Sequence, residues 1–268
     1  MEKKTFFDKY VAAGNDFLVV DNRAGLVKKP AEAAKALCDR KMGVGADGLL
    51  LLERSKKATI KMRIFNPDGS QAEMCGNGVR CLAHFAFNRK LAGARHTVET
   101  GAGLIEAQVR GAVVKAKLTD PNGLRLNVRL NINGHGESLH LINTGVPHAV
   151  IVDKDLDACE VQTRGRAIRT HAHFSPRGTN VNFIRRTQEG IAVRTYERGV
   201  EGETLACGTG STASALVASS LFGLASPVRV KTQSGETLKV HYKKGPKGYS
   251  QVFLEGPVTK SFEGSVDL

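Results

Sequence analysis

The chain carries one local pattern twice, and the two copies decide which fold can be expected. The first copy runs from Arg63-Ile-Phe-Asn66 to Cys75-Gly-Asn-Gly78, and the second from Arg194-Thr-Tyr-Glu197 to Cys207-Gly-Thr-Gly210. The two cysteines are 207 − 75 = 132 residues apart in a chain of 268. A plan that is used twice rather than many times excludes a solenoid and predicts two similar domains related by a pseudo-twofold axis. Ligand sites often lie between such domains, so we expect the site in the cleft between them.

The elements around this repeat predict an α+β fold with mostly antiparallel sheets. Helices are expected from Pro30 to about Met42, after Cys75, after Cys207 and around Thr163. A turn-rich break at Thr119-Asp-Pro-Asn-Gly123 marks the boundary between a domain of residues 1–119 and a domain of residues 120–257. Residues 258–268 are expected to pack back on the first domain. Strands are predicted at 17–21, 48–52, 59–65, 104–110, 112–118, 139–143, 149–152, 181–185, 191–196, 228–232, 237–242 and 251–254.

Composition places the chain among ordinary globular proteins of a reducing compartment. Apolar residues make up 41% and charged residues 24%, which excludes a disordered or fibrous chain. No stretch approaches the roughly 18–20 apolar residues of a membrane span, and no apolar signal core follows the first residues, so no membrane partner and a cytoplasmic location are expected. Five cysteines form an odd set, which favours free thiols over a disulfide framework.

The net charge of +13 raises the question of an anionic partner such as nucleic acid. The 39 Lys and Arg are scattered along the chain, without the interleaved aromatic residues of a base-stacking surface, so no nucleic-acid partner is expected. The histidines and cysteines lack paired metal-ligand spacing apart from His171-Ala-His173, so no metal is expected. The glycine-rich stretch from Gly43 to Gly48 lacks the ending of a phosphate-binding loop and is interpreted as a turn that shapes a pocket wall.

Both cysteines are predicted to sit just before a helix, because apolar residues follow each at helical spacing. Helix N-termini present unpaired backbone N–H groups and a partial positive charge, which favour a thiolate or hold a substrate carboxylate. Two thiols that face each other across a cleft suit inversion of a stereocentre. One removes a proton as thiolate, and the other delivers a proton from the opposite face as thiol. Nothing in the sequence calls for pyridoxal phosphate or another cofactor.

Along nearly its whole length the chain closely resembles the diaminopimelate epimerase family. The resemblance implies two pseudo-symmetric domains, each a mixed, mostly antiparallel sheet wrapped around a central helix. It also implies cofactor-independent interconversion of LL- and meso-diaminopimelate, in lysine and peptidoglycan precursor synthesis, by a homodimer. The family's motifs appear in order as Gly14-Asn-Asp-Phe17, Asn66-Pro-Asp-Gly-Ser70, Glu73-Met-Cys-Gly-Asn-Gly78 with Arg80-Cys81, Glu99-Thr-Gly101, Gly145-Val-Pro-His148, Asn180-Val-Asn182, and Glu197-Arg198 followed by Ala206-Cys-Gly-Thr-Gly210.

The resemblance also implies a role for individual residues. Cys75 and Cys207 would be the acid/base pair, and His148 and Glu197 would lie beside them and tune their ionisation. Amides and a guanidinium suit the binding of carboxylates and ammonium groups. The residues implied in substrate binding are Asn15, Asn66, Gly76, Asn77, Asn180, Glu197, Arg198, Gly208 and Thr209.

Two departures and four alternatives stay open. Gly48 stands where some members carry a glutamine that contacts substrate, and Val146 where some carry an asparagine, so contacts at the far end of the substrate are less defined. A proline or hydroxyproline racemase resembles the same two-cysteine plan but typically has His where Asn77 stands. A related isomerase of phenazine synthesis shares the fold without relying on a cysteine pair. From other classes, a thiol redox protein and a nucleic-acid-binding module remain alternatives.

Overall fold

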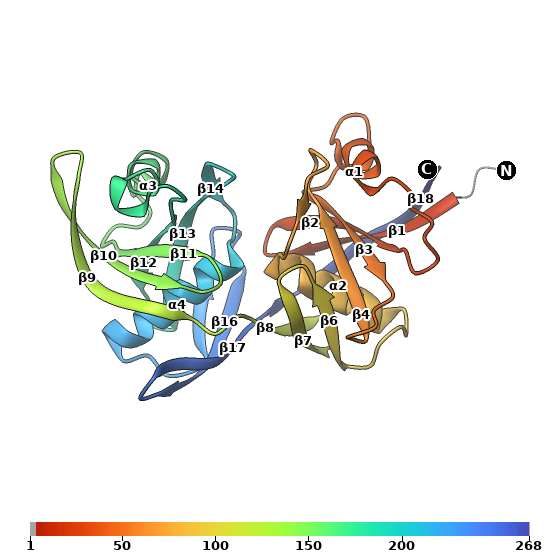
Figure 1. Cartoon of the computed structure of the whole chain (residues 1–268). Helices are drawn as coiled ribbons and strands as arrows, with labels where there is room; N and C mark the ends of the chain where they lie inside the picture. Colours follow the sequence, from red (N-terminus) through yellow and green to blue (C-terminus); the bar gives the residue numbers. More distant parts are fainter. Residues whose placement is uncertain (1–3, 268) are drawn as a thin grey trace. The chain divides into compact units, whose positions relative to one another are not determined.

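The structure is a computed structural model that describes residues 4–267. The chain forms two compact units (Figure 1). The described part of the first unit consists of residues 4–117 and 256–267, and the second unit of residues 118–255. The first unit is therefore assembled from two separate stretches of the chain.

The first unit holds two helices and most of its strands in the N-terminal stretch. Its last strand comes from the far end of the described chain. Its elements are β1 (Lys4–Ala12), β2 (Asn15–Asp21), α1 (Pro30–Cys38), β3 (Gly48–Glu53), β4 (Ile60–Phe65), β5 (Gln71–Ala72), α2 (Gly76–Asn88), β6 (Arg95–Thr100), β7 (Gly103–Arg110), β8 (Val113–Lys117) and β18 (Thr259–Asp267).

The second unit repeats this order of strands and helices. Its last strand, β17, extends two residues beyond the unit's end. Its elements are β9 (Asn122–Ile132), β10 (His135–Asn143), β11 (Pro147–Val152), α3 (Val161–Arg169), a 3₁₀ turn (Ala172–Phe174), β12 (Asn180–Arg186), β13 (Gly190–Glu197), β14 (Gly202–Thr204), α4 (Gly208–Phe222), β15 (Val228–Lys231), β16 (Thr237–Gly245) and β17 (Gly248–Pro257).

Strand pairing follows one plan in both units. In the first, β2 is parallel to β3, β3 antiparallel to β4, and β4 parallel to β6. In the second, β11 is parallel to β12, β12 antiparallel to β13, and β13 parallel to β15. A parallel pair needs a long connection, and α1, α2, α3 and α4 supply the four that these pairs require. The duplication predicted from the two cysteine motifs is confirmed, as is the α+β class.

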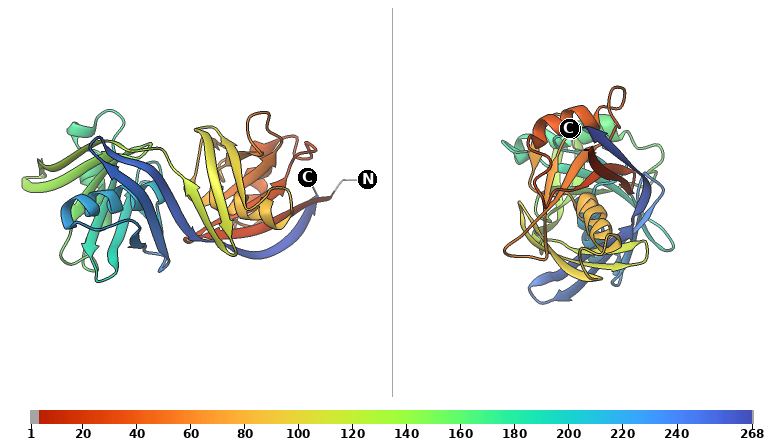
Figure 2. Two further views of the ribbon diagram at one scale, coloured as in Figure 1. Left: turned by 90° about the horizontal axis from the view of Figure 1, so that it is seen from below. Right: turned by 90° about the vertical axis from the view of Figure 1, so that its right-hand side faces the viewer.

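Each unit wraps its strands around one buried helix. Helix α2 packs against β1, β2, β7 and β8, and Figure 2 shows it enclosed by strands of its unit. Helix α4 packs against β10 to β13, β15 and β16. Residues 210–219 of α4, which are mostly Ala, Ser, Leu and Val, are all buried. A helix without a polar face belongs in a core, so both central helices are held on every side by their sheets.

Helix α1 is shorter than the sequence predicts. It ends at Cys38, whereas apolar spacing predicts a helix to about Met42. The Asp39 carboxylate accepts hydrogen bonds from the backbone N–H groups of Lys41 (2.7 Å) and Met42 (2.8 Å), which forms a turn instead of a further helical turn. Short polar side chains compete with the helix for backbone donors in this way.

Four long strands were not predicted from the sequence: β1, β6, β9 and β18. Strand β1 buries the charged residues Asp8 and Lys9, which hides the alternation of a strand. Strand β18 is mostly exposed and pairs antiparallel with β1, from Lys4 opposite Asp267 to Val11 opposite Thr259. Pairing between distant segments, rather than local pattern, therefore defines β1 and β18, whereas β6 and β9 pair with the strand that follows each of them. No helix among residues 4–267 has the length and apolar character that a membrane crossing requires.

Candidate active site

Cys75 and Cys207 occupy the same position in their units, at the N-cap of the central helix. Both have extended backbone, and each carbonyl oxygen accepts the first helical hydrogen bond at 2.8 Å. The Cys75 Sγ accepts from the Gly78 backbone N–H at 3.5 Å, and the Cys207 Sγ lies 3.4 Å from the Thr209 hydroxyl. The helix-capping position that the sequence predicts is confirmed for both. Each sulfur thus lies at the positive end of a buried helix dipole.

In the first unit, Asn15 joins Cys75 to the glycine-rich loop. The Cys75 thiol donates to the Asn15 Oδ1 at 3.8 Å, while the Asn15 Nδ2 donates to the Asp47 carboxylate at 2.6 Å. Asp47 is in turn bound by Arg40 at 2.7 Å. The loop from Gly43 to Gly48 therefore orients the amide of Asn15 so that its oxygen faces the thiol.

Gly76 and Asn77 lie in the first turn of α2 and are held by Arg80. Arg80 is fully buried; its guanidinium donates to the Asn77 Oδ1 at 2.8 Å and to the Gly76 carbonyl at 3.3 Å. The Asn77 oxygen is thereby occupied, which leaves its amide N–H groups as donors. Asn66 lies in a different turn, where its Nδ2 donates to the Ser70 hydroxyl at 2.9 Å.

The Gly48 position leaves little room for a side chain. A Cβ at Gly48 would lie 3.0 Å from the Phe65 carbonyl oxygen and 3.3 Å from the Phe17 ring. A glutamine in the manner of some family members would require both neighbours to shift.

In the second unit, Glu197 is the hydrogen-bond partner of Cys207. Its carboxylate also accepts from the Thr204 hydroxyl at 3.1 Å. Burial raises the pKa of the Glu197 carboxyl, and the hydrogen bonds from Thr204 and Cys207 oppose that rise. The cysteine is thus paired with a carboxylate whose proton affinity is greater than usual.

His148 and Asn180 lie on neighbouring strands, and Arg198 follows directly after β13. His148 on β11 pairs with Asn180 on β12 in the parallel register. The Asn180 side chain accepts from the Arg198 backbone N–H at 2.8 Å and donates to the Pro147 carbonyl at 3.3 Å. Burial of His148, together with the positive charge of Arg198, lowers the pKa of His148 to about 3. The imidazole is therefore neutral near pH 7.

Gly208 and Thr209 form the first turn of α4, where the Thr209 carbonyl accepts from the Thr144 hydroxyl at 3.2 Å. The structure thus gathers two sets of the predicted residues. One set lies around Cys75 in the first unit. In the second unit, Glu197, Gly208 and Thr209 lie at Cys207, and Asn180 and Arg198 lie near His148.

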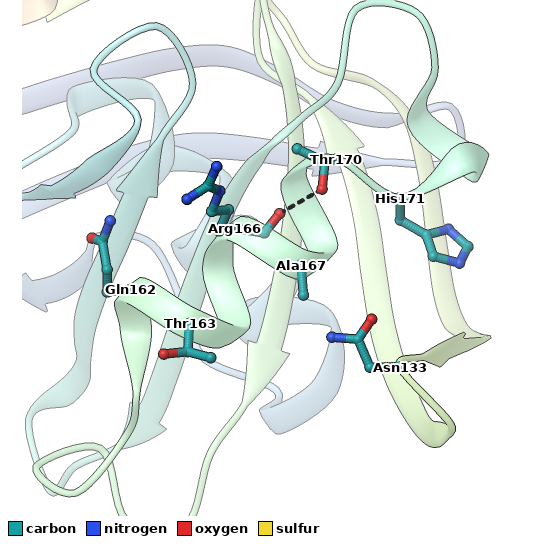
Figure 3. Close-up of a pocket in the computed structure, with 7 residues that line it drawn as sticks. All are labelled: Asn133, Gln162, Thr163, Arg166, Ala167, Thr170 and His171. Carbon is teal, nitrogen blue, oxygen red and sulfur yellow. Dashed lines mark hydrogen bonds between the residues drawn. The ribbon is translucent and has the colours of Figure 1, made fainter.

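A separate hollow of about 600 Å³ lies on the second unit beside α3 (Figure 3). The Thr170 hydroxyl there donates to the Arg166 carbonyl at 2.9 Å, a contact within the end of the helix. None of the predicted site residues is among those that line it. Its lining consists of Asn133, Gln162, Thr163, Arg166, Ala167, Thr170 and His171. Within residues 4–267, no group of three or more His, Cys, Asp or Glu is placed to hold a metal ion.

Comparison with known proteins identifies the family. The family model described as Diaminopimelate epimerase matches residues 7–121 and 140–260. The chain belongs to the diaminopimelate epimerase family. A relative named Diaminopimelate epimerase from Hydrogenobaculum sp. (strain Y04AAS1) is 46% identical over 272 residues, covering 96% of each chain. A relative of the same name from Aquifex aeolicus (strain VF5) is 45% identical and also covers 96% of each chain.

Solved structures with the same fold are more distant in sequence. A phenazine biosynthesis protein of the PhzF family from Bacillus anthracis superposes with a TM-score of 0.79 at 19% identity, covering 99% of this chain and 100% of that one. A hydroxyproline epimerase from Agrobacterium vitis superposes with a TM-score of 0.72 at 14% identity, covering 100% and 93%. At these identities the likeness concerns the fold alone.

Proposed function

We propose that this protein interconverts LL- and meso-2,6-diaminopimelate by two-base proton transfer, with Cys75 and Cys207 acting on opposite faces of one Cα. The activity would place it in lysine and peptidoglycan precursor synthesis. The observation that carries the proposal is the equivalent placement of the two cysteines, each at the N-cap of the buried central helix of its unit.

The proposed step balances without a cofactor. A thiolate takes the α-proton and becomes a thiol, and the electron pair of the broken C–H bond stays on Cα as a carbanion. The second cysteine then gives its proton to the other face and becomes the thiolate. The product leaves with the opposite configuration at Cα, and the two cysteines have exchanged their thiol and thiolate states. In the reverse reaction each cysteine takes the other's role.

The helix ends suit the charge that develops. Backbone N–H groups of Gly76, Gly208 and Thr209 are proposed to hold the substrate carboxylate and stabilise the carbanion as its charge spreads onto that group. His148 and Glu197 are proposed to act on the ionisation of the cysteines. The remaining ligands of the proposed substrate site are Asn15, Asn66, Asn77, Asn180 and Arg198.

The proposal includes a cytoplasmic homodimer that binds neither nucleic acid nor membrane. The family resemblance supports the dimer, and the odd number of cysteines, five, fits a reducing compartment better than a disulfide framework. Light scattering coupled to gel filtration measures the mass of the particle directly. A monomer, or salt-sensitive binding to mixed DNA, would remove this part of the proposal.

The test follows α-proton exchange in deuterated water. Under reducing conditions, LL-diaminopimelate should gain deuterium at Cα and appear as the meso isomer. Cys75→Ala and Cys207→Ala should each abolish inversion, because each removes one of the two proton carriers. Cys38→Ala is the matched control, since Cys38 is the last residue of α1 and is buried in a core cluster of the first unit, outside both central helices.

The alternatives give different results. Exchange on proline or hydroxyproline, but not on diaminopimelate, would move the assignment to the racemases. The absence of exchange on all of these substrates, together with reversible oxidation by thioredoxin-like partners, would favour a thiol redox protein. Retained inversion in either cysteine variant would contradict the two-base step.

A further inference from the structure

His148 is bound on one side by an asparagine that the proposed chemistry leaves unassigned. Its imidazole is 1% exposed, and its Nδ1 lies 3.1 Å from the Asn182 Nδ2. Asn182 stands on β12 and is fully buried. The contact joins two strands whose residues are 34 positions apart in sequence.

Two other contacts identify which amide atom of Asn182 faces the histidine. The Asn182 Nδ2 lies 3.1 Å from the Ala149 carbonyl oxygen, and the Asn182 Oδ1 lies 3.0 Å from the Thr195 hydroxyl. A carbonyl oxygen can only accept, so the atom beside Ala149 must be the amide nitrogen. The reversed amide would place two acceptor oxygens against each other in a buried site. The orientation is therefore fixed by chemistry, independently of the histidine.

This orientation decides the tautomer of the ring. The Asn182 nitrogen has two hydrogens, one for Ala149 and one for the His148 Nδ1. A nitrogen that accepts a hydrogen bond carries no proton, so in the neutral ring the proton lies on Nε2. The Nε2 is buried and has no hydrogen-bond partner among residues 4–267. A buried N–H without a partner is destabilising, and that cost is recovered when an acceptor arrives.

Asn182 is also in contact with the helix that carries Cys207. A Cβ at Gly210, in the first turn of α4, would lie 2.4 Å from the Asn182 Oδ1. Gly210 thus leaves the space that the amide fills. Asn182 lies between His148 on one side and the start of α4 on the other.

We infer that Asn182 is a positioning residue that fixes His148 as the Nε2–H tautomer, so that His148 offers the site a hydrogen-bond donor for an anionic group rather than a base. The importance of this donor for turnover rests on the proposed function, whereas the tautomer assignment rests only on the contacts of Asn182. Proton acceptance at Nδ1 would require loss of the Asn182 contact. The lowered pKa of His148 agrees with a ring that stays neutral.

Nitrogen-15 NMR of the full-length protein tests the tautomer without substrate. Long-range proton–nitrogen correlation distinguishes a protonated from an unprotonated ring nitrogen, and the His148 signals are those lost in His148→Gln. The expected result at pH 7.5 is a protonated Nε2 and an unprotonated Nδ1. An Nδ1–H tautomer in the unsubstituted protein would overturn the inference, whatever the variants do.

The Asn182→Asp variant provides a second test of the tautomer, because a carboxylate accepts hydrogen bonds and cannot donate them. It should draw a proton onto Nδ1, as a reversed tautomer or as a charged ring. Thr195→Val is the matched control, since it removes a hydroxyl from the Oδ1 side and keeps the Ala149 contact. Its His148 spectrum should match that of the unsubstituted protein. An unchanged spectrum in Asn182→Asp would reduce Asn182 to a core contact and overturn the inference.

Kinetics separate this inference from the proposed function. With diaminopimelate, Asn182→Asp should lower kcat by about tenfold or more and change its pH profile, with a smaller change in KM. If the unsubstituted protein shows the Nε2–H tautomer but no epimerisation, the proposed function fails and the tautomer assignment stands. If it epimerises and shows the Nδ1–H tautomer, the inference alone fails.

Discussion

Two different acceptors face the two cysteine thiols, and only one of them can hold a proton. The Cys75 thiol is bonded to the amide oxygen of Asn15, whereas Cys207 is bonded to the carboxylate of Glu197. An amide oxygen is not basic enough to be protonated near neutral pH, but a buried carboxylate is closer to that range. The two cysteines are therefore equivalent in position, but they differ in the group that accepts a hydrogen bond from each thiol.

This difference gives a prediction for the pH dependence of the reaction. Burial raises the pKa of Glu197 above the usual value for a glutamate, so the protonated form persists to higher pH. A protonated Glu197 cannot accept the Cys207 proton, so kcat/KM should fall as pH drops through the raised pKa. In Glu197→Gln this acid limb should disappear, and kcat should be lower by about 10²-fold. Initial rates from pH 4.5 to 9 measure both effects.

The matched control is Glu189→Gln, which removes an exposed carboxylate paired with Arg229 on the same unit. Its pH profile should be that of the unsubstituted protein. If the acid limb persists in Glu197→Gln, another group titrates there and the assignment of Glu197 is wrong.

Some features of the site could be predicted from the sequence, and others could not. The capping positions of Cys75 and Cys207 were predictable, because glycines before an apolar helical run are a local signal. Asp47 and Asn182 were not, because each acts on a partner 32 or 34 residues away. Such contacts depend on which strands lie side by side, and no local pattern carries that information.

At the scale of elements, the two central helices begin under different constraints. At Gly78 on α2, the nearest contact of an added Cβ is the flexible end of Leu50 at 3.3 Å. At Gly210 on α4, it is the Asn182 amide at 2.4 Å, with the Cys207 Cβ at 3.2 Å. The start of α4 is therefore the tighter of the two.

Alanine substitution should therefore be more damaging at Gly210 than at Gly78. Alanine favours a helix over glycine by about 1 kcal/mol, but overpacking costs about 1–3 kcal/mol. Gly210→Ala should lower the urea midpoint and turnover, Gly78→Ala should do so less, and Gly136→Ala, which meets no atom within 4 Å, should serve as the neutral control. A Gly210→Ala variant as stable and active as the control would mean that the helix start relaxes freely.

The elements that were predictable are those whose pattern is set by their own burial. Strand β3 reads Gly-Leu-Leu-Leu-Leu-Glu and is buried on both faces, so its apolar run identifies it. Strand β1 was missed because Lys9 forms an ion pair with Asp16 inside the unit, 2.7 Å away. Strand β9 was missed because most of its residues are exposed. A strand that buries charged residues, or one that is mostly exposed, lacks the alternation of apolar and polar residues from which strands are predicted.

At the scale of the whole molecule, the first unit depends on a strand that is distant in sequence. Strand β18 pairs with β1, and its Phe262 ring packs edge-on against Phe7 at 6.1 Å between centroids. Arg89 at the end of α2 binds both Asp8 on β1 and Glu263 on β18. The second unit, in contrast, is a single stretch of chain.

Removal of β18 should therefore weaken one unit selectively. In a chain truncated after residue 258, hydrogen exchange should quicken in β1, β2 and α2, because β1 loses its partner. Exchange in α4 and in β11 to β13 should stay unchanged. Phe262→Ala is the matched control, since it deletes the ring contact and keeps the backbone pairing. Equal loss of protection in both units would show that they do not unfold separately.

The return of β18 to β1 also orders events during synthesis. A ribosome adds about 5–20 residues per second, so the 258 − 12 = 246 residues between the end of β1 and the start of β18 take roughly 10–50 s to translate. For that time the nascent β1 has one edge without its β18 partner. The second unit, already complete at residue 255, is free to fold first. The N-terminal unit thus cannot be completed before the second unit has been synthesised, and the emerging β1 edge is where a nascent-chain chaperone has most to protect.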